Sequence, residues 1–450
     1  MKHRSSSSSR YPLAFLTIAL VSALAACGGE EPGLSSGSGE GLGGSGLAGS
    51  GAGGAGQGGA DQGGGGQGGA GLTACTDTPA KPILTELRAN LDAGMLKHAA
   101  ASGWPVQVST GCYLFVSTDA KLDRLAGDHN GWMGETMKAD TGFRWLVRGA
   151  AAGNKYKFTN GTDWVADRWS RSYNYDGNGE ISLILPSTAH LDRHFNVAGA
   201  GLPGRTVRVW VPVGTRTHVL YVHDGQNLFD PYSAWGGWHL QDAAPAGMLL
   251  VGIDNTPGRM DEYTHVQDKI SGFGAPLGGK GDAYADFIKN TVRPLVKAKY
   301  GEPTKVGTMG SSLGGLISFH LADKNPGDYI FAASLSGTMG WGKIGATNQT
   351  IIERFVAHGH GTTKLYLDSG GGYDDNGNQV PCADTDGDGI KDDVELGDNY
   401  CENIQMRDTL AGLGYQFEKD LWHWWEPNAP HNEAAWKDRV FRPLQIFAGL

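Results

Sequence analysis

The pattern of apolar and polar residues divides the chain into regions of different structural character. Residues 28–72 contain almost no bulky apolar side chains, residues 73–195 contain short alternating runs, and residues 196–450 contain apolar runs separated by amphipathic segments. Alternation with a period of two is typical of strands, and apolar residues three or four positions apart are typical of helices. The pattern therefore predicts a small all-β domain followed by a larger α/β domain.

The region 73–195 begins with a helical pattern at 83–101 and continues as short strands between glycine turns. The predicted strands lie at 106–109, 112–116, 143–147 and 155–159. From Leu202 onward strands and helices alternate, which is typical of a mostly parallel sheet covered on both faces. The strands are predicted at 205–211, 217–222, 248–253, 305–309, 330–334 and 363–367, with helices at 284–300 and 404–413.

One segment of the α/β domain has the spacing of a nucleophile at a sharp turn. Gly310-Ser311-Ser312-Leu313-Gly314 has the form G-x-S-x-G and lies between a strand pattern at 304–309 and a helix pattern at 316–322. In such a turn a side chain two residues before or after the nucleophile would collide with the backbone, so both positions are glycine. Ser312 is therefore the predicted nucleophile, and the N–H of Leu313 is a predicted oxyanion donor. A glycine-rich turn with an incidental serine is the alternative.

A second oxyanion donor is expected on the loop after the strand at 217–222, and either Gly225 or Gln226 fits that position. His223 and Asp224 lie in the same loop, but the chain order Ser…Asp…His requires an acid and a base that follow Ser312.

His431 lies on a loop before the last helix, which is the expected place of the general base. His358 and His360 are alternative candidates for the base by residue type alone. His423 is expected to pack among the tryptophans of 421–425.

The acid that orients His431 is expected on the turn after the strand at 363–367. Asp368, Asp374 and Asp375 are all available there. An acid beyond the glycine turn can point toward the histidine more readily than one at the end of the strand, so Asp374 is predicted, with Asp368 as the alternative.

Several segments together resemble the esterase D group of α/β-hydrolases: Leu220–Asp230, Val251–Asn255, Arg259 with Glu262 and Tyr263, Gly310–Gly315 and His431–Trp436. That group includes enterochelin, feruloyl and acetylxylan esterases, S-formylglutathione hydrolases and mycolyltransferases, and the resemblance covers about 205–450. It implies an α/β-hydrolase fold and ester hydrolysis with Ser312 as nucleophile and His431 as base. In the group the acid stands three residues past a glycine, which supports Asp374 if Gly371 is the matching glycine.

The all-β region resembles the immunoglobulin-like modules that precede starch-branching and debranching enzymes, through the segment 125–132 and tryptophans along the strands. In those modules exposed tryptophans can stack on sugar rings. Here the tryptophans are expected mainly in the core or at the domain interface. They are Trp132, Trp145, Trp164 and Trp169.

An acidic insertion at 382–401 lies between the predicted acid and the base. Its segment 384–395 places acids at positions 1, 3, 5, 9 and 12 and glycine at position 6, as in an EF-hand calcium loop. The alternative is a solvated acidic loop. We expect structural Ca²⁺ and no organic cofactor. The predicted ligands are Asp384, Asp386, Asp388, the Ile390 carbonyl, Asp392 and Glu395.

The chain has five cysteines, an odd number. Cysteines within the same region of the chain are expected to pair, which predicts the disulfides Cys382–Cys401 and Cys75–Cys112. Cys27 is then left for another role. Residues 1–27 have the basic start, apolar run and small residues of a secretory signal, and Leu24-Ala-Ala-Cys27 resembles the bacterial lipobox. An ordinary signal peptide or a single membrane helix is the alternative.

Lipidated Cys27 would hold the protein at the bacterial envelope, and Gly28 in place of aspartate favours the outer membrane or cell surface. The glycine-rich segment 28–72 is expected to be a flexible linker with a reach of roughly 35–40 Å.

A net charge of −10 argues against a nucleic-acid partner. The sequence therefore predicts a lipid-tethered serine esterase that forms an acyl-enzyme on a small-molecule or glycan ester. The alternatives are siderophore-ester cleavage, acyl transfer, feruloyl or acetyl removal from polysaccharide, and a non-catalytic carbohydrate-binding surface protein.

Overall fold

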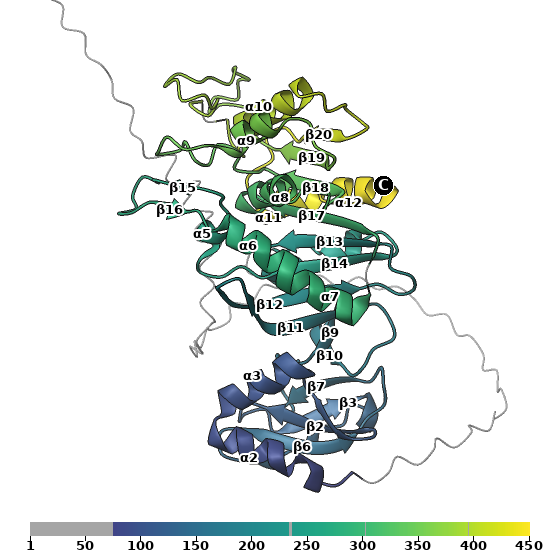
Figure 1. Cartoon of the computed structure of the whole chain (residues 1–450). Helices are drawn as coiled ribbons and strands as arrows, with labels where there is room; N and C mark the ends of the chain where they lie inside the picture. Colours follow the sequence, from purple (N-terminus) through teal and green to yellow (C-terminus); the bar gives the residue numbers. More distant parts are fainter. Residues whose placement is uncertain (1–74, 234–235, 302, 395) are drawn as a thin grey trace, which may run out of the picture.

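The computed structural model describes residues 75–233, 236–301, 303–394 and 396–450 (Figure 1). The predicted signal, the linker, Cys27 and Glu395 lie outside these ranges. In the described ranges, no helix combines the length and the apolar character that crossing a bilayer requires.

The N-terminal part contains two helices packed on a four-stranded sheet (Figure 1). The helical pattern at 83–101 is interrupted at Asn90, whose side chain accepts a hydrogen bond from the Ala93 N–H (3.1 Å) and begins a second helix. Their bounds are η1 Thr78–Ala80, α2 Lys81–Ala89 and α3 Leu91–Ala101. The sheet has the order β1 (Val106–Ser109), β2 (Cys112–Ser117), β6 (Arg144–Gly149) and β5 (Lys138–Ala139).

A second sheet packs against the other face of the first, and the two enclose a core that includes Phe115, Leu125, Leu146 and Phe158. The N-terminal part is therefore a two-sheet sandwich. The elements of the second sheet are β3 Arg124–Gly127, η2 Asp128–Asn130, β4 Glu135–Thr136, β7 Lys155–Thr159, β8 Trp164–Val165, β9 Ser172–Asp176 and β10 Gly179–Leu183.

The second sheet continues without a break into the sheet of the α/β part. Strand β11 (His190–Gly199) pairs with β9 on one side and with β12 (Leu202–Val211) on the other. The predicted domain boundary at 195/196 therefore falls inside a strand that both parts share.

The α/β part has a parallel sheet of six strands, which β12 extends in antiparallel fashion (Figure 1). The order is β20-β19-β18-β17-β13-β14-β12, so the sheet agrees with the predicted α/β-hydrolase arrangement. The strands are β13 His218–His223, β14 Met248–Ile253, β17 Lys305–Ser311, β18 Phe331–Leu335, β19 Lys364–Ser369 and β20 Leu421–Trp425.

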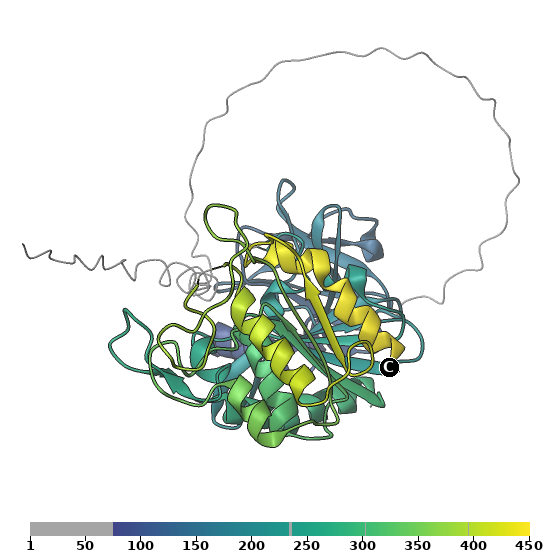
Figure 2. The same cartoon turned by 90° about the horizontal axis from the view of Figure 1, so that it is seen from above.

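Both faces of this sheet are buried, because alternate residues along its strands enter different cores. Val219, Tyr221 and Val251 pack in one core, and Leu220, Val222 and Leu250 pack in the other. The first core is covered by α6 Gly281–Phe287, η4 Ile288–Val292, α7 Arg293–Tyr300, α8 Leu313–Lys324, α9 Ile351–His358 and α10 Tyr400–Gly412. The second is covered by α4 Leu240–Ala243, α11 Glu433–Arg439 and α12 Phe441–Gly449 (Figure 2).

Both predicted amphipathic helices are present. The one at 284–300 runs through α6, the π-helical turn η4 and α7, and the one at 404–413 is α10. The remaining elements lie in connections near the carboxyl ends of the strands: η3 Gly225–Asn227, α5 Arg259–Glu262, β15 Gln267–Asp268 and β16 Leu277–Gly278.

Candidate active site

Ser312 occupies the sharp turn between β17 and α8, as the sequence predicted. Its backbone has φ 56° and ψ −126°, a conformation that residues other than glycine rarely adopt. A Cβ on Gly310 would lie 2.6 Å from the main chain of Gly314, so only glycine allows the turn to close. The Ser312 N–H donates to the carbonyl of Leu335 on the neighbouring strand (2.9 Å), which holds the turn at the sheet edge.

His431 lies on the loop between β20 and α11, and an aspartate holds its imidazole. Nδ1 of His431 is 2.7 Å from Oδ1 of Asp398. The ring of His431 also meets the Trp436 ring edge-on, with centroids 4.9 Å apart. A carboxylate at Nδ1 leaves Nε2 to accept a proton, which is the arrangement a general base needs.

Asp398 is fully buried, and three other groups donate hydrogen bonds to its second oxygen. Oδ2 accepts from the Ser336 hydroxyl (2.7 Å), from Nη2 of Arg439 (3.1 Å) and from the N–H of Gly370. Burial acts to raise the pKa of Asp398, but the bond to His431 and the charge of Arg439 outweigh burial and lower that pKa. Asp398 is therefore ionised at neutral pH.

Ser336 connects the nucleophile turn with the acid and the base. Leu335 pairs with Ser311 in the parallel register, so Ser336 follows β18 beside Ser312. Its hydroxyl donates to Asp398 and accepts from Nε1 of Trp436 (2.9 Å). Ser312, Ser336 and Asp398 all have positive φ, of 56°, 50° and 49°. Strained residues gather at functional sites, so this cluster supports a catalytic role for the region.

The prediction that Asp374 or Asp368 orients His431 is wrong. The carboxylate of Asp374 accepts the N–H groups of Asn376 (2.9 Å) and Asn378 (2.8 Å) and so closes its own turn. Asp368 is fully buried and paired with Nε of Arg439 (2.9 Å), and burial raises its pKa to about 6.

The glycines after β19 make room for the segment that carries the true partner. A Cβ on Gly370 would lie 2.7 Å from Oδ2 of Asp398, and one on Gly371 would lie 2.2 Å from the carbonyl of Gly397. The glycine run therefore marks the place where the end of the insertion packs on the strand turn. The glycine run is thus the feature of the sequence that pointed to Asp398, although such a run is also typical of a simple turn.

The predicted oxyanion loop begins at the end of β13. A Cβ on Gly225 would lie 2.6 Å from the Asp254 carboxylate, so the chain passes through a space that only glycine fits. Nε and Nη2 of Arg259 donate to the two oxygens of Asp224 (2.8 and 2.9 Å) and hold the loop at its base. Within the described residues, no group accepts a hydrogen bond from the main-chain N–H of Gly225, Gln226 or Leu313. The oxyanion role of these three N–H groups stays a prediction.

The other histidines have structural surroundings. His223 is buried between the Tyr284 hydroxyl (3.0 Å) and the Thr308 hydroxyl (3.2 Å), and burial lowers its pKa to about 3. Burial in β20 lowers the pKa of His423 to about 4. His358 and His360 contact Asp323 and Asp420 at the surface.

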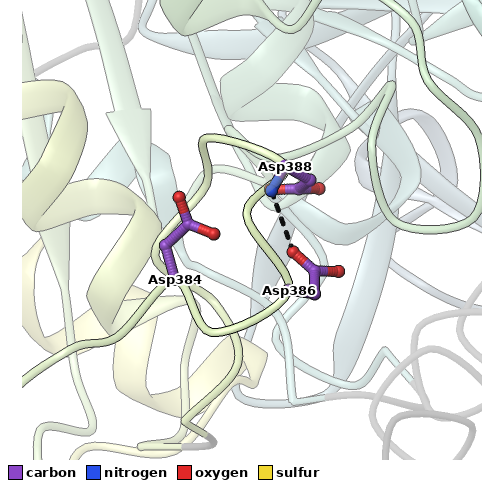
Figure 3. Close-up of side chains that lie close together, drawn as sticks. All are labelled: Asp384, Asp386 and Asp388. Carbon is purple, nitrogen blue, oxygen red and sulfur yellow. Dashed lines mark hydrogen bonds between the residues drawn. The ribbon is translucent and has the colours of Figure 1, made fainter.

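The acidic loop brings three of its predicted ligands together (Figure 3). Carboxylate oxygens of Asp384, Asp386 and Asp388 lie within 4.8 Å of one another. The two oxygens of Asp384 accept the N–H groups of Gly387 (2.8 Å) and Gly389 (3.1 Å), which folds the loop around the cluster. Three converging carboxylates are a donor set that suits a hard cation such as Ca²⁺. Asp392 is not part of this cluster of described residues.

Both predicted disulfides are confirmed, as Cys75–Cys112 and Cys382–Cys401. The second one closes a segment that contains both the acidic loop and Asp398.

The predicted placement of the tryptophans is only partly correct. Trp145 is buried, but Trp164 is 44% exposed, and its ring lies 6.2 Å from that of Trp132. Both line a pocket of about 940 Å³ on the N-terminal sandwich, together with Lys155, Lys157 and Asp163. Trp164 is exposed because β8 lies off the main strand order of the sheet and pairs with β7, and Trp132 is half-buried beside it.

Comparison with known proteins places the α/β part in a family. The model of the Putative esterase family matches residues 203–438. The uncharacterized protein YbbA of Bacillus subtilis is 32% identical over 170 residues, which is 36% of this chain and 58% of that protein. The match thus spans a little over half of that relative.

The chain is also similar to solved structures, two of which follow. Enterochelin esterase from Shigella flexneri is 12% identical, with 75% of this chain and 92% of that chain covered and a TM-score of 0.42. Siderophore hydrolase EstA from Aspergillus nidulans is 16% identical, with 57% and 94% covered and a TM-score of 0.42. The family match spans more than half of the chain, and the chain therefore belongs to the Putative esterase family.

Proposed function

We propose that the protein hydrolyses carboxylic esters through an acyl-enzyme on Ser312. The Ser312 hydroxyl oxygen attacks the ester carbonyl carbon while Nε2 of His431 takes its proton. The imidazolium then gives that proton to the departing alkoxide, which leaves the acyl group on Ser312. Water then attacks this acyl-enzyme while His431 takes a proton from the water. His431 returns the proton to the Ser312 oxygen as the acid leaves. The contact between Asp398 and His431 beside the Ser312 turn is the observation that carries this proposal.

The charges in the site suit each step. Ionised Asp398 stabilises the imidazolium that forms during attack. The N–H of Leu313 would donate a hydrogen bond to the negatively charged carbonyl oxygen and stabilise it. The N–H of Gly225 or Gln226 would be the second donor.

The proposal is tested with a panel of acetyl, feruloyl, nitrophenyl and catecholate-siderophore esters. Ser312→Ala should lower turnover at least about 10³-fold. Ser311→Ala, the neighbouring buried serine, is the matched control and should stay within a few fold of the parent. Equal turnover by the parent and Ser312→Ala on every ester would remove the assignment. The ester that the parent cleaves fastest identifies the substrate class.

A second function is favoured by exposed Trp164 and half-buried Trp132, which lie side by side in one pocket. Its neighbouring aromatic faces, with lysine and aspartate side chains at the pocket rim, are the groups that stack on a sugar ring and bond its hydroxyls. We propose that this pocket binds an α-glucan. Trp164→Ala should lose retention on insoluble starch, while Tyr232→Ala, which also removes an exposed ring, should keep it. Absence of retention for the parent would contradict the proposal.

We also propose that the acidic loop binds Ca²⁺ through Asp384, Asp386 and Asp388, with the Ile390 carbonyl, Asp392 and Glu395 as further ligands. The convergence of three carboxylates supports this proposal.

We further propose that lipidated Cys27 tethers the protein to the bacterial envelope. The parent should then be recovered with the membrane fraction, and Cys27→Ala should lose the lipid. Equal partition of the two proteins would contradict the anchor.

A further inference from the structure

Glu433 connects the oxyanion loop with the segment that carries the base. It begins α11, two residues after His431, and its side chain is largely buried. Its Oε1 accepts from Nδ2 of Asn227 (3.0 Å), and its Oε2 accepts from Nε1 of Trp238. These partners lie about two hundred residues earlier in the chain, so one carboxylate connects two distant segments.

Both partners belong to the oxyanion loop and its continuation. Asn227 directly follows Gln226, and its N–H donates to the carbonyl of Asp224 (2.9 Å). The N–H of Trp238 donates to the carbonyl of Asn227 (2.9 Å), so the two partners are fixed to each other. A shift of Asn227 therefore moves the N–H of Gln226, and it does so without any direct contact between Glu433 and the substrate.

At its other end Glu433 is fixed relative to His431. The Asn432 side chain accepts the N–H of Ala435 (3.0 Å) and so caps α11. Trp436 on the same helix packs against the His431 ring and bonds Ser336. The distance between the base and the oxyanion donors thus depends on the two hydrogen bonds that Glu433 accepts.

We propose that Glu433 is a positioning residue that holds the oxyanion loop in register with His431 during ester hydrolysis, and this rests on the esterase function proposed above. Asn227 Nδ2 and Trp238 Nε1 are both donors, one at each oxygen of Glu433, so the ionised carboxylate offers both an acceptor, whereas in the protonated acid one of the two oxygens carries a proton of its own and is the weaker acceptor.

The charge state of Glu433 responds to pH in the neutral range. Burial raises its pKa to about 7, and Asp224 adds to this, whereas Trp238, Arg259 and Asn227 oppose it. Glu433 must therefore lose its proton before the site is fully arranged.

The test compares Glu433→Gln with the parent on the best ester of the panel. A glutamine oxygen can accept one of the two hydrogen bonds, but the glutamine amide repels the other donor. We expect kcat to fall about 10–100-fold with KM changed less than threefold, because misplacement acts on the developing oxyanion. We also expect affinity for a boronic acid, which forms a tetrahedral adduct on Ser312, to fall by a similar factor.

The pH profile separates positioning from a merely structural role. The acid limb of log kcat should be steeper in the parent than in Glu433→Gln, because only the parent has the Glu433 carboxyl group to titrate. Trp238→Phe, which removes one bond and keeps the carboxylate, should keep the steeper slope with a smaller loss of kcat. An unchanged kcat, or identical acid limbs in parent and variant, overturns the proposal. Failure of the esterase function itself would appear separately, as Ser312→Ala without effect.

Discussion

Asp398 and His431 lie in contact, 2.7 Å apart, although the aspartate comes from the end of an insertion in the α/β fold. The same insertion carries the acidic loop at 384–395 and is closed by Cys382–Cys401. The groups that stabilise the insertion therefore also determine where the carboxylate stands relative to the base. This relationship leads to the first three predictions.

Asp398→Asn should lower kcat by about 10⁴-fold, because an amide at this position favours the wrong tautomer of His431. Asp374→Asn is the matched control and should stay within about twofold, since Asp374 only closes its own turn. The measurement is steady-state kinetics on the best ester. A larger fall in kcat for Asp374→Asn than for Asp398→Asn would support the sequence-based prediction that Asp374 orients His431.

Removal of Cys382–Cys401 should lower both stability and activity. The bond joins residues 19 apart, and its loss in Cys382→Ser/Cys401→Ser should cost about 3 kcal/mol of unfolding free energy. We expect kcat to fall about tenfold or more, because Asp398 lies inside the closed segment. The Cys75→Ser/Cys112→Ser variant should lose stability in the N-terminal sandwich and keep kcat. Equal kcat in both variants would show that the insertion does not depend on its disulfide.

Calcium should stabilise the protein. At a concentration of about one hundred times Kd, the ion adds about 2.7 kcal/mol, which corresponds to a Tm increase of about 5–10 °C in a part of this size. Addition of a chelator should reverse the shift and lower kcat, because Asp398 follows the loop by three residues. Asp384→Asn/Asp388→Asn should show no shift, and Asp375→Asn should behave as the parent. A Tm that does not respond to Ca²⁺ in the parent would rule out the site.

The stability contributed by His223 should depend on pH. Its pKa is lowered to about 3 in the folded protein by burial, whereas its ordinary value is 6.5. Between these values the unfolded chain binds a proton that the folded protein does not, so this histidine lowers stability as the pH falls below 6.5. His223→Gln should therefore cost about 2 kcal/mol less at pH 5 than at pH 7.5. Urea unfolding at the two pH values measures this difference, and an equal cost at both would contradict it.

The strands, the sharp turn at Ser312 and the loop position of His431 were predictable because their signals are local. Gly310 and Gly314 are needed by the backbone of the turn itself, and the alternation of apolar residues in β13 and β14 reflects two buried faces. The disulfides were predictable for the same reason, since each cysteine pairs within its own region.

The acid was not predictable from spacing, because the insertion separates Asp398 from the strand turn where the family pattern expects it. Gly370 and Gly371 carried a signal, but its meaning depends on which segment packs against them. In the same way, nothing local distinguishes the exposed Trp164 from the buried Trp145, because exposure depends on which strand lies at the sheet edge.

The sequence alone predicted the esterase family of the chain, the sharp turn at Ser312 and the position of His431 on a loop before α11, because a strained turn and a chain order are properties of neighbouring residues. Only the tertiary structure decided that Asp398 faces His431, that Glu433 connects with Asn227, and that β11 joins both parts in one sheet. Each of these depends on close approach between segments far apart in the chain, and the packing of the whole sheet and its insertion decides which segments meet.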